Sequence, residues 1–141
     1  MFRTILVPVD LEHLEHSKEL LRVAAQFASQ EGADVHLLNV IYGPPAVVSQ
    51  YLPADYEKKA SADTKAKLER VAGAVEFGAG KVVCAVRHGN SYPEILDYSE
   101  EIKADLIVMA SHRPGVADYL LGSTAARVVR HAACSVFVVR H

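Results

Sequence analysis

The chain has 141 residues, of which 50% are hydrophobic, and a formal net charge of −2 from 15 basic and 17 acidic side chains. This length and apolar content predict one domain over residues 1–141 with a substantial core. The sequence has no basic stripe or tail, which argues against a nucleic-acid partner. No apolar run reaches the roughly 20 residues that a membrane-spanning helix needs, so no membrane partner is expected.

The N-terminal run and the cysteines indicate a cytoplasmic protein. The first residues enter a strand pattern at once, in a run too short for a signal-peptide core and without a cleavage site. Cys84 and Cys134 each lie in an apolar, β-like run and are expected to be buried, reduced thiols. Neither has a His or Cys neighbour in the sequence that would suggest a zinc site.

Apolar runs alternate with helical stripes along the chain. The runs at residues 4–9, 35–41, 81–87, 106–110 and 135–140 predict strands covered on both faces. Spacings of three and four predict helices at 14–30, 54–75, 91–102 and 123–131. This alternation predicts a single-domain α/β fold, an open doubly wound parallel sheet that binds its ligand beyond the carboxyl ends of the strands. The first helix has inward positions Leu14, Ser17, Leu21, Ala24 and Ala28 and is expected to end at Gly32.

A capping box marks the start of the predicted helix at 91–102. Ser91 and Glu94 have the spacing at which a serine hydroxyl and a carboxylate each accept a backbone N–H bond. Pro93 suits the first helical turn, where its missing donor is harmless.

Two of the predicted strands end in polar residues. The first ends in Pro8-Val9-Asp10, where Asp10 either binds a ribose hydroxyl or a metal-bound phosphate, or caps the next helix. The fourth ends in Met109-Ala110-Ser111-His112-Arg113. His112 is either a phosphate or base contact or a structural histidine. Arg113 is either a bidentate phosphate ligand, a solvated cation, or a partner for a carboxylate of another subunit.

Gly122, Ser123 and Thr124 open the last predicted helix. Free N–H groups, the favourable end of the helix dipole and two hydroxyls are suited to an anion. The alternative is an ordinary serine N-cap after a turn glycine. The linker from Ala110 is long enough to fold back over a ligand, which favours the anion site.

Other chemistries find little support in the sequence. It has no P-loop, no dinucleotide fingerprint after the first strand and no nucleophile elbow. His13 and His16 beside Glu12 and Glu15 are better explained as a charged helical turn than as a metal site. No nucleophile–base pair stands out, so the chain is expected at most to be a weak ATPase or phosphotransferase, and more readily no enzyme.

Several segments resemble the universal stress protein family. They are residues 5–10, 37–40, 104–109, and 120–123 through 138–140, and the likeness extends over essentially the whole chain. Ser111-His112-Arg113-Pro114 is similar to the small bacterial members of the F and G types. The resemblance implies a five-stranded parallel sheet in the order 3-2-1-4-5 with four helices. It also implies a homodimer through the edge strand from Ser135 to Arg140, whose exposed edge would then be paired. Whether two such dimers join as a tetramer is left open by the sequence.

The glycine motif of the ATP-binding branch is altered in this chain. That branch carries Gly-x-x-Gly, nine residues, and then Gly-Ser/Thr. Here Ala110 and Arg113 take the two glycine positions, and eight residues separate Arg113 from Gly122. Arg113 adds bulk where glycine permits close backbone approach, and a charge that could replace backbone donors. Arg113 is therefore either a phosphate ligand or a plug.

The resemblance implies a stress-response protein that binds ATP or a related adenine nucleotide, with or without Mg²⁺, and with little or no turnover. The alternative is a nucleotide-free dimeric interaction protein of the same fold. In the first case Val9 and Val40 would flank the adenine, and Asp10 would lie near the base or sugar. Pro8 is also implied as a binding residue. The remaining implied residues are Met109, Ala110, His112 and Arg113 along the sugar and phosphates, and Gly122, Ser123 and Thr124 at the phosphate tail.

Overall fold

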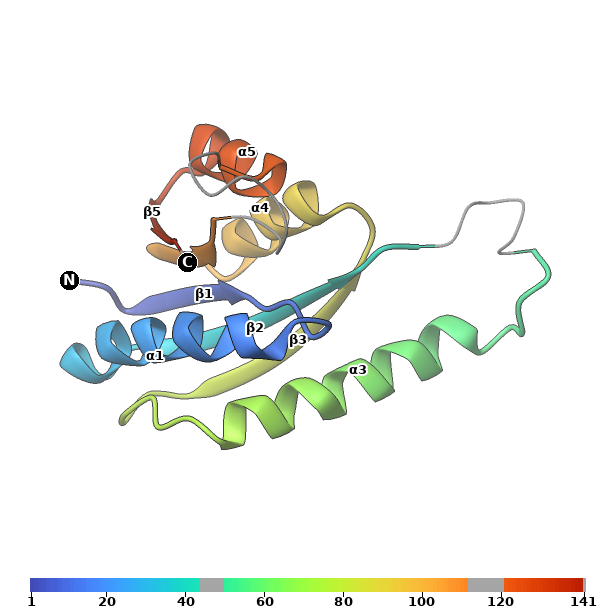
Figure 1. Cartoon of the computed structure of the whole chain (residues 1–141), viewed down its shortest axis with the longest axis horizontal. Coiled ribbons are helices and arrows are strands. Elements are labelled where there is room, and N and C mark those ends of the chain that lie inside the picture. The colour runs from blue at the N-terminus through green and yellow to red at the C-terminus, as the bar shows by residue number, and fades with distance from the viewer. Residues whose placement is uncertain (44–49, 112–120, 141) are drawn as a thin grey trace.

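The computed structural model describes residues 1–43, 50–111 and 121–140. In these residues strands and helices alternate, as the sequence predicts, with boundaries that differ by at most two residues (Figure 1). The elements are β1 (Thr4–Pro8), α1 (Leu14–Glu31), β2 (Asp34–Ile41), α3 (Tyr56–Gly73), β3 (Val82–His88), α4 (Ser91–Glu101), β4 (Leu106–Ala110), α5 (Ser123–His131) and β5 (Ser135–Val139).

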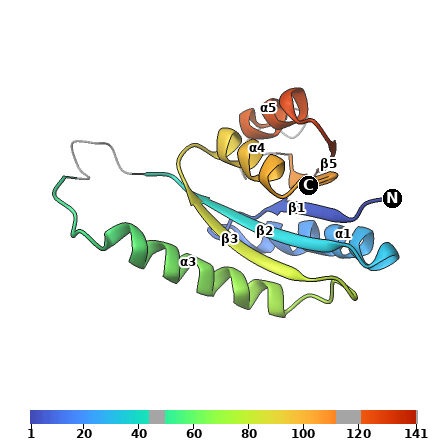
Figure 2. The ribbon, with the colours of Figure 1, turned by 180° about the vertical axis from the view of Figure 1, so that it is seen from behind.

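The strands form one five-stranded sheet in the order β3-β2-β1-β4-β5. Every neighbouring pair is parallel, which confirms the predicted fold class and strand order. Helices α1 and α3 cover one face, and α4 and α5 cover the other (Figures 1 and 2). The chain changes direction across the sheet between β1 and β4, so this is the switch point of a doubly wound fold.

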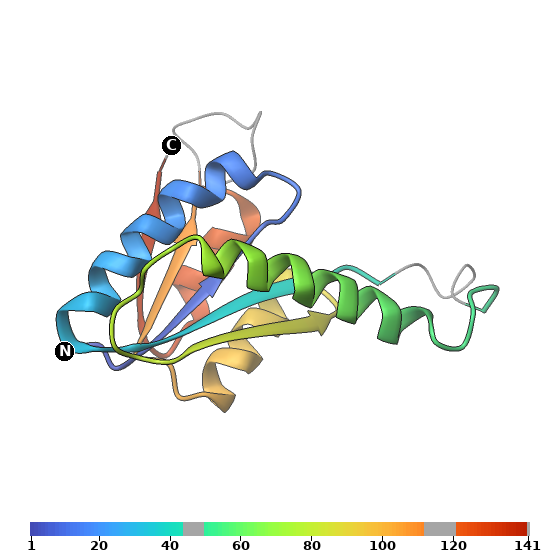
Figure 3. The same cartoon turned by 90° about the horizontal axis from the view of Figure 1, so that it is seen from below.

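Each face of the sheet has its own hydrophobic core. Because successive strand residues point to opposite faces, Ile5 and Val7 pack under α1 and α3, whereas Leu6 packs under α4 and α5. All three side chains are fully buried. Figure 3 shows α1 and α3 lying along the first of these faces. A sheet covered on both sides accounts for the nearly continuous apolar strands of the sequence.

Two details of the helices differ from expectation. In α1 the buried stripe includes Leu20, while Leu14 at the first position is 44% exposed. The capping box at α4 is wrong, because Asn90 is the N-cap and makes no side-chain cap bond. Ser91 is already helical, so its hydroxyl is past the N-cap position from which serine satisfies the helix start. The end of α1 is as predicted, with Gly32 left-handed at φ 66°.

Cys84 and Cys134 are both free, as expected, but each is half-buried rather than buried. Burial raises the pKa of both thiols. Among the described helices none is both long and apolar enough to span a membrane.

Gly80 lies where the segments that lead into β2 and β3 pack too closely for a side chain. A Cβ added there would lie far inside contact distance of the Ala33 carbonyl oxygen. Since backbone cannot rotate away, we expect Gly80→Ala to lower the free energy of unfolding by about 1–3 kcal/mol in denaturant titrations. Gly73→Ala is the matched control, because a Cβ there meets nothing within 4 Å. Equal losses in both variants would contradict this account.

Candidate crevice between strands β1 and β4

Strand β1 stays paired with β2 for longer than it stays paired with β4. Its register with β2 runs from Thr4 to Pro8, and the Val9 N–H continues it by donating to the Leu38 carbonyl at 2.8 Å. Its register with β4 includes only Ile5 and Leu6. The pairing of β1 with β4 therefore ends before the carboxyl ends of the two strands, at the switch point where the strand order predicts a ligand crevice.

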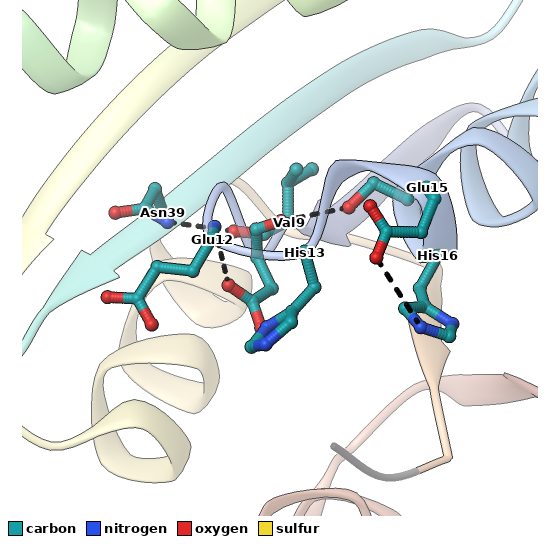
Figure 4. A network of polar contacts seen from close by, with 8 residues as sticks. Val9, Glu12, His13, Glu15, His16 and Asn39 are labelled. Carbon is teal, nitrogen blue, oxygen red and sulfur yellow. Dashed lines mark hydrogen bonds and ion pairs between the residues drawn. The ribbon is translucent and has the colours of Figure 1, made fainter. Parts of the chain in front are cut away.

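Two polar side chains hold the segment that follows β1. Asn39 of β2 donates from its amide nitrogen to the Val9 carbonyl at 2.8 Å (Figure 4). The hydroxyl of Ser17 in α1 donates to the Asp10 carbonyl at 3.0 Å. Both carbonyls lie where the strand has ended, so these bonds replace the sheet as their partners. The backbone beside the crevice is thereby held from β2 and from α1.

The Asp10 carboxylate organises the turn that leads into α1. One of its oxygens accepts the Glu12 backbone N–H at 2.9 Å, and the other lies 3.0 Å from His13 Nδ1. Asp10 thus closes the turn, while the N-cap of α1 is His13, without a side-chain cap bond. The hydrogen bond that His13 donates to the Asp10 carboxylate raises the pKa of His13, which keeps the imidazole protonated to higher pH. The Asp10 carboxylate and the His13 imidazole therefore lie together in the turn that follows β1.

Asp10, Glu12 and His13 together offer three possible metal-ligand atoms within 4.8 Å of one another. Figure 4 shows the Glu12 and His13 side chains leaving the same turn, whereas His16 lies beside Glu15 on α1. The paired histidines of the sequence are thus not a single ligand set. Two carboxylates suit Mg²⁺, which prefers oxygen, better than the imidazole does.

The start of α5 is attached directly to the end of β4. The Ser111 N–H donates to the Val139 carbonyl of β5 at 2.9 Å, and the Gly122 N–H donates to the Ser111 carbonyl at 2.7 Å. Ser111 is completely buried. These bonds bring the N-terminus of α5 to the carboxyl end of β4, as an anion site at the crevice requires.

The N-cap of α5 is Gly122, so the serine N-cap considered for Ser123 is not formed. Ser123 is exposed, Thr124 is half-buried, and both lie in the first helical turn. Backbone N–H groups at this position have no partner within their helix. In the described residues no side chain caps them. Within residues 1–43, 50–111 and 121–140 they are therefore available as donors to an anion.

The other predicted binding residues differ in their access to the crevice. Val9 and Met109 are each only 4% exposed and can offer little beyond backbone. Val9 packs in the core under α1, whereas Val40 packs against the core under α4, so their side chains belong to opposite faces. Pro8 and Ala110 are half-buried. His112 and Arg113 lie outside the described residues.

The polar end of β3 does not join this crevice, because β2 lies between β3 and β1. His88 instead attaches β3 to α3. Its Nε2 lies 2.5 Å from the Ser61 hydroxyl oxygen, and its Nδ1 lies 3.6 Å from a Glu57 carboxylate oxygen.

Sequence reasoning missed the three residues that hold the crevice, namely Ser17, Asn39 and Ser111. Asn39 has a visible signal, because it is an amide inside an otherwise apolar strand. The spacing of the sequence places Ser17 in the apolar stripe of its helix, and the residue is indeed only 4% exposed. A buried serine in such a stripe needs a partner, which here is the Asp10 carbonyl.

Solved structures similar to this chain share its fold over nearly its whole length. One is the hypothetical protein MJ0577, with a TM-score of 0.84 and 26% identity, covering 100% of this chain and 97% of that one. More distant structures include a universal stress protein in complex with cAMP, with a TM-score of 0.66 and 23% identity, covering 99% and 97%. Another is the universal stress protein of Archaeoglobus fulgidus in complex with dAMP, with a TM-score of 0.60 and 20% identity, covering 98% of each chain.

Comparison of sequences gives the same relationship. Universal stress protein G of Salmonella typhimurium is 33% identical over 143 aligned residues, which cover 99% of this chain and 100% of that protein. The family model described as the universal stress protein family matches residues 1–140. With the strand order and the crevice described above, these matches show that the chain belongs to the universal stress protein family.

Proposed function

We propose that this chain is a cytoplasmic stress-response protein that binds ATP or a related adenine nucleotide between β1 and β4, with little or no turnover. The observation that carries the proposal is the attachment of α5 to β4. The bond from Gly122 to Ser111 brings a helix N-terminus to the place where the two strands part. A helix N-terminus at a switch point is a favourable site for a nucleotide phosphate.

In this proposal one set of residues would bind the phosphate tail of the nucleotide, and another would bind its ribose or metal ion. The backbone N–H groups of Ser123 and Thr124, with their hydroxyls, would bind the phosphate tail. Asp10 would bind the ribose, or a Mg²⁺ ion carried by the phosphates, since its carboxylate is exposed. His13, whose pKa Asp10 raises, would supply a positive charge beside the phosphates.

The two distant relatives solved with cAMP and dAMP support an adenine nucleotide as the ligand class. At 23% and 20% identity they show that this fold accepts such ligands, but they assign no residue of this chain. The assignment of residues rests on the hydrogen bonds and burial of the present structure.

Ser123→Glu is expected to abolish the phosphate site while preserving the helix. A carboxylate in the first turn is favourable to the helix dipole, so the melting temperature should hold or rise. The same carboxylate would occupy and repel the phosphate position. Since a charge-assisted hydrogen bond contributes about 1.5–3 kcal/mol, ATP affinity in calorimetric titrations with Mg²⁺ should fall by about tenfold or more.

The matched control is Gln26→Glu, which adds the same charge at an exposed position late in α1. It should leave ATP affinity unchanged. If the unaltered protein gives no heat with ATP and carries no nucleotide through purification, the nucleotide proposal fails and the interaction-protein alternative stands. Phosphate release from ATP, compared with Asp10→Ala, tests turnover separately.

We also propose that β5 pairs with β5 of a second copy to form a twofold dimer. Strand β5 is an edge of the sheet, and its Phe137 is 43% exposed. The centroid of the Phe137 ring lies 5.1 Å from the centroid of the Phe27 ring on α1, so an aromatic surface extends from the edge. An exposed apolar edge strand is a favourable template for pairing with another chain. An antiparallel pair of identical strands satisfies twofold symmetry.

Phe137→Lys is expected to shift the protein from dimer to monomer in analytical ultracentrifugation, because a charged edge residue opposes strand pairing. Val82→Lys is a closely matched control. Val82 lies on β3, the opposite edge, and is 42% exposed. It should leave the dimer intact. A dimer that survives Phe137→Lys, or that Val82→Lys dissociates, would place the interface elsewhere.

A further inference from the structure

A cavity lies on the outside of α5, between that helix and the first turn of α4, which are neighbours in both views of Figures 1 and 2. We call it the α4–α5 groove. Its volume is about 630 Å³, which is in the range of small-molecule sites. Its described lining residues are Tyr92, Leu121, Ala126, Arg127, Arg130 and His131. The groove is distinct from the crevice, because none of Asp10, Ser123 and Thr124 lines it.

The charged side chains among the described lining residues of the groove are all basic. Two of the lining residues are arginines and one is a histidine, and none of them is acidic. Within residues 1–43, 50–111 and 121–140, neither Arg127 nor Arg130 forms an ion pair. Arg130 and His131 lie in the last turn of α5, where the helix dipole alone favours cations. Arg127 lies in the middle of the helix, so that explanation does not extend to it.

The Tyr92 ring fixes the position of two of these side chains. The Arg127 guanidinium carbon lies 5.0 Å from the ring centroid, in a cation–π contact. The His131 ring is stacked at 6.4 Å with an interplanar angle of 27°. A guanidinium already held in place loses less conformational freedom when it binds a ligand. Arg127 and Arg130 are three residues apart, so both can reach one group on the same side of the helix.

We propose that the α4–α5 groove is a binding site for a small organic phosphate. Arg127 and Arg130 bind the phosphate oxygens through their N–H groups, since the planar guanidinium matches phosphate geometry. The organic part of the ligand lies against the Tyr92 ring and the Leu121 side chain. This site does not depend on nucleotide binding in the crevice.

The test is a titration of the isotope-labelled protein with phenyl phosphate, followed by amide NMR shifts. Saturable shift changes at Tyr92, Arg127 and Arg130 are expected. The double substitution Arg127→Gln with Arg130→Gln should weaken binding by about tenfold or more, because it removes charge-assisted hydrogen bonds. Both side chains are exposed, so the fold should be retained, and circular dichroism checks this. Arg22→Gln, an exposed arginine of α1, is the matched control and should bind as the unaltered protein does.

Two further variants separate the possible outcomes. Tyr92→Leu keeps apolar bulk but removes the ring that holds Arg127, so binding should weaken several-fold even where the double variant misfolds. Ser123→Glu should retain phenyl phosphate binding whether or not it loses ATP, which separates this proposal from the nucleotide proposal. Three results would overturn the site: no saturable change, shifts confined to Ser123 and Thr124, or equal affinity in the double arginine variant.

Discussion

The parting of β1 from β4 is the constraint on which the rest of this molecule depends. In a parallel sheet every connection crosses over a face, and the direction of winding reverses once, between these two strands. The reversal sends α1 to one face and α5 to the other, so no helix covers the carboxyl ends at that point. Because β1 continues along β2 as far as Val9, it is the β4 side that opens.

An opening of this kind leaves strand-end backbone groups without ladder partners, and buried groups of that sort must find others. Asn39 and Ser17 supply them for Val9 and Asp10, and Ser111 does the equivalent work between β5 and α5. The side chains of Asn39 and Ser17, and the backbone of Ser111, therefore have a structural task that exists before any ligand binds. A crevice held in this way needs little rearrangement to accept a phosphate, which lowers the entropic cost of binding.

The limits of sequence reasoning follow from the range of the interactions involved. Strands 4–8 and 106–110 are readable because burial on both faces leaves an apolar run, which is a local property. The order of the strands follows only from the family resemblance, because hydrophobic periodicity does not predict which strands are neighbours in the sheet. The capping box at Ser91 failed because spacing alone does not fix which residue is the N-cap. Asn39 binds the carbonyl of Val9, 30 residues away, and the Ser111 N–H binds the carbonyl of Val139, 28 residues away. No local sequence pattern encodes such distant pairs.

The packing of helix α5 fixes the position of two surfaces, its first turn and the α4–α5 groove. Ala125 and Val128 are its buried residues, and the bond from Gly122 to Ser111 fixes its start. Once these points are set, the helical repeat determines the direction of every other side chain. The first turn then lies beside the carboxyl end of β4, while Arg127 and Arg130 line the α4–α5 groove. A change that repacks Ala125 or Val128 would turn both surfaces together, whereas a change at an exposed position alters one alone. The core under α5 therefore sets the geometry of both surfaces.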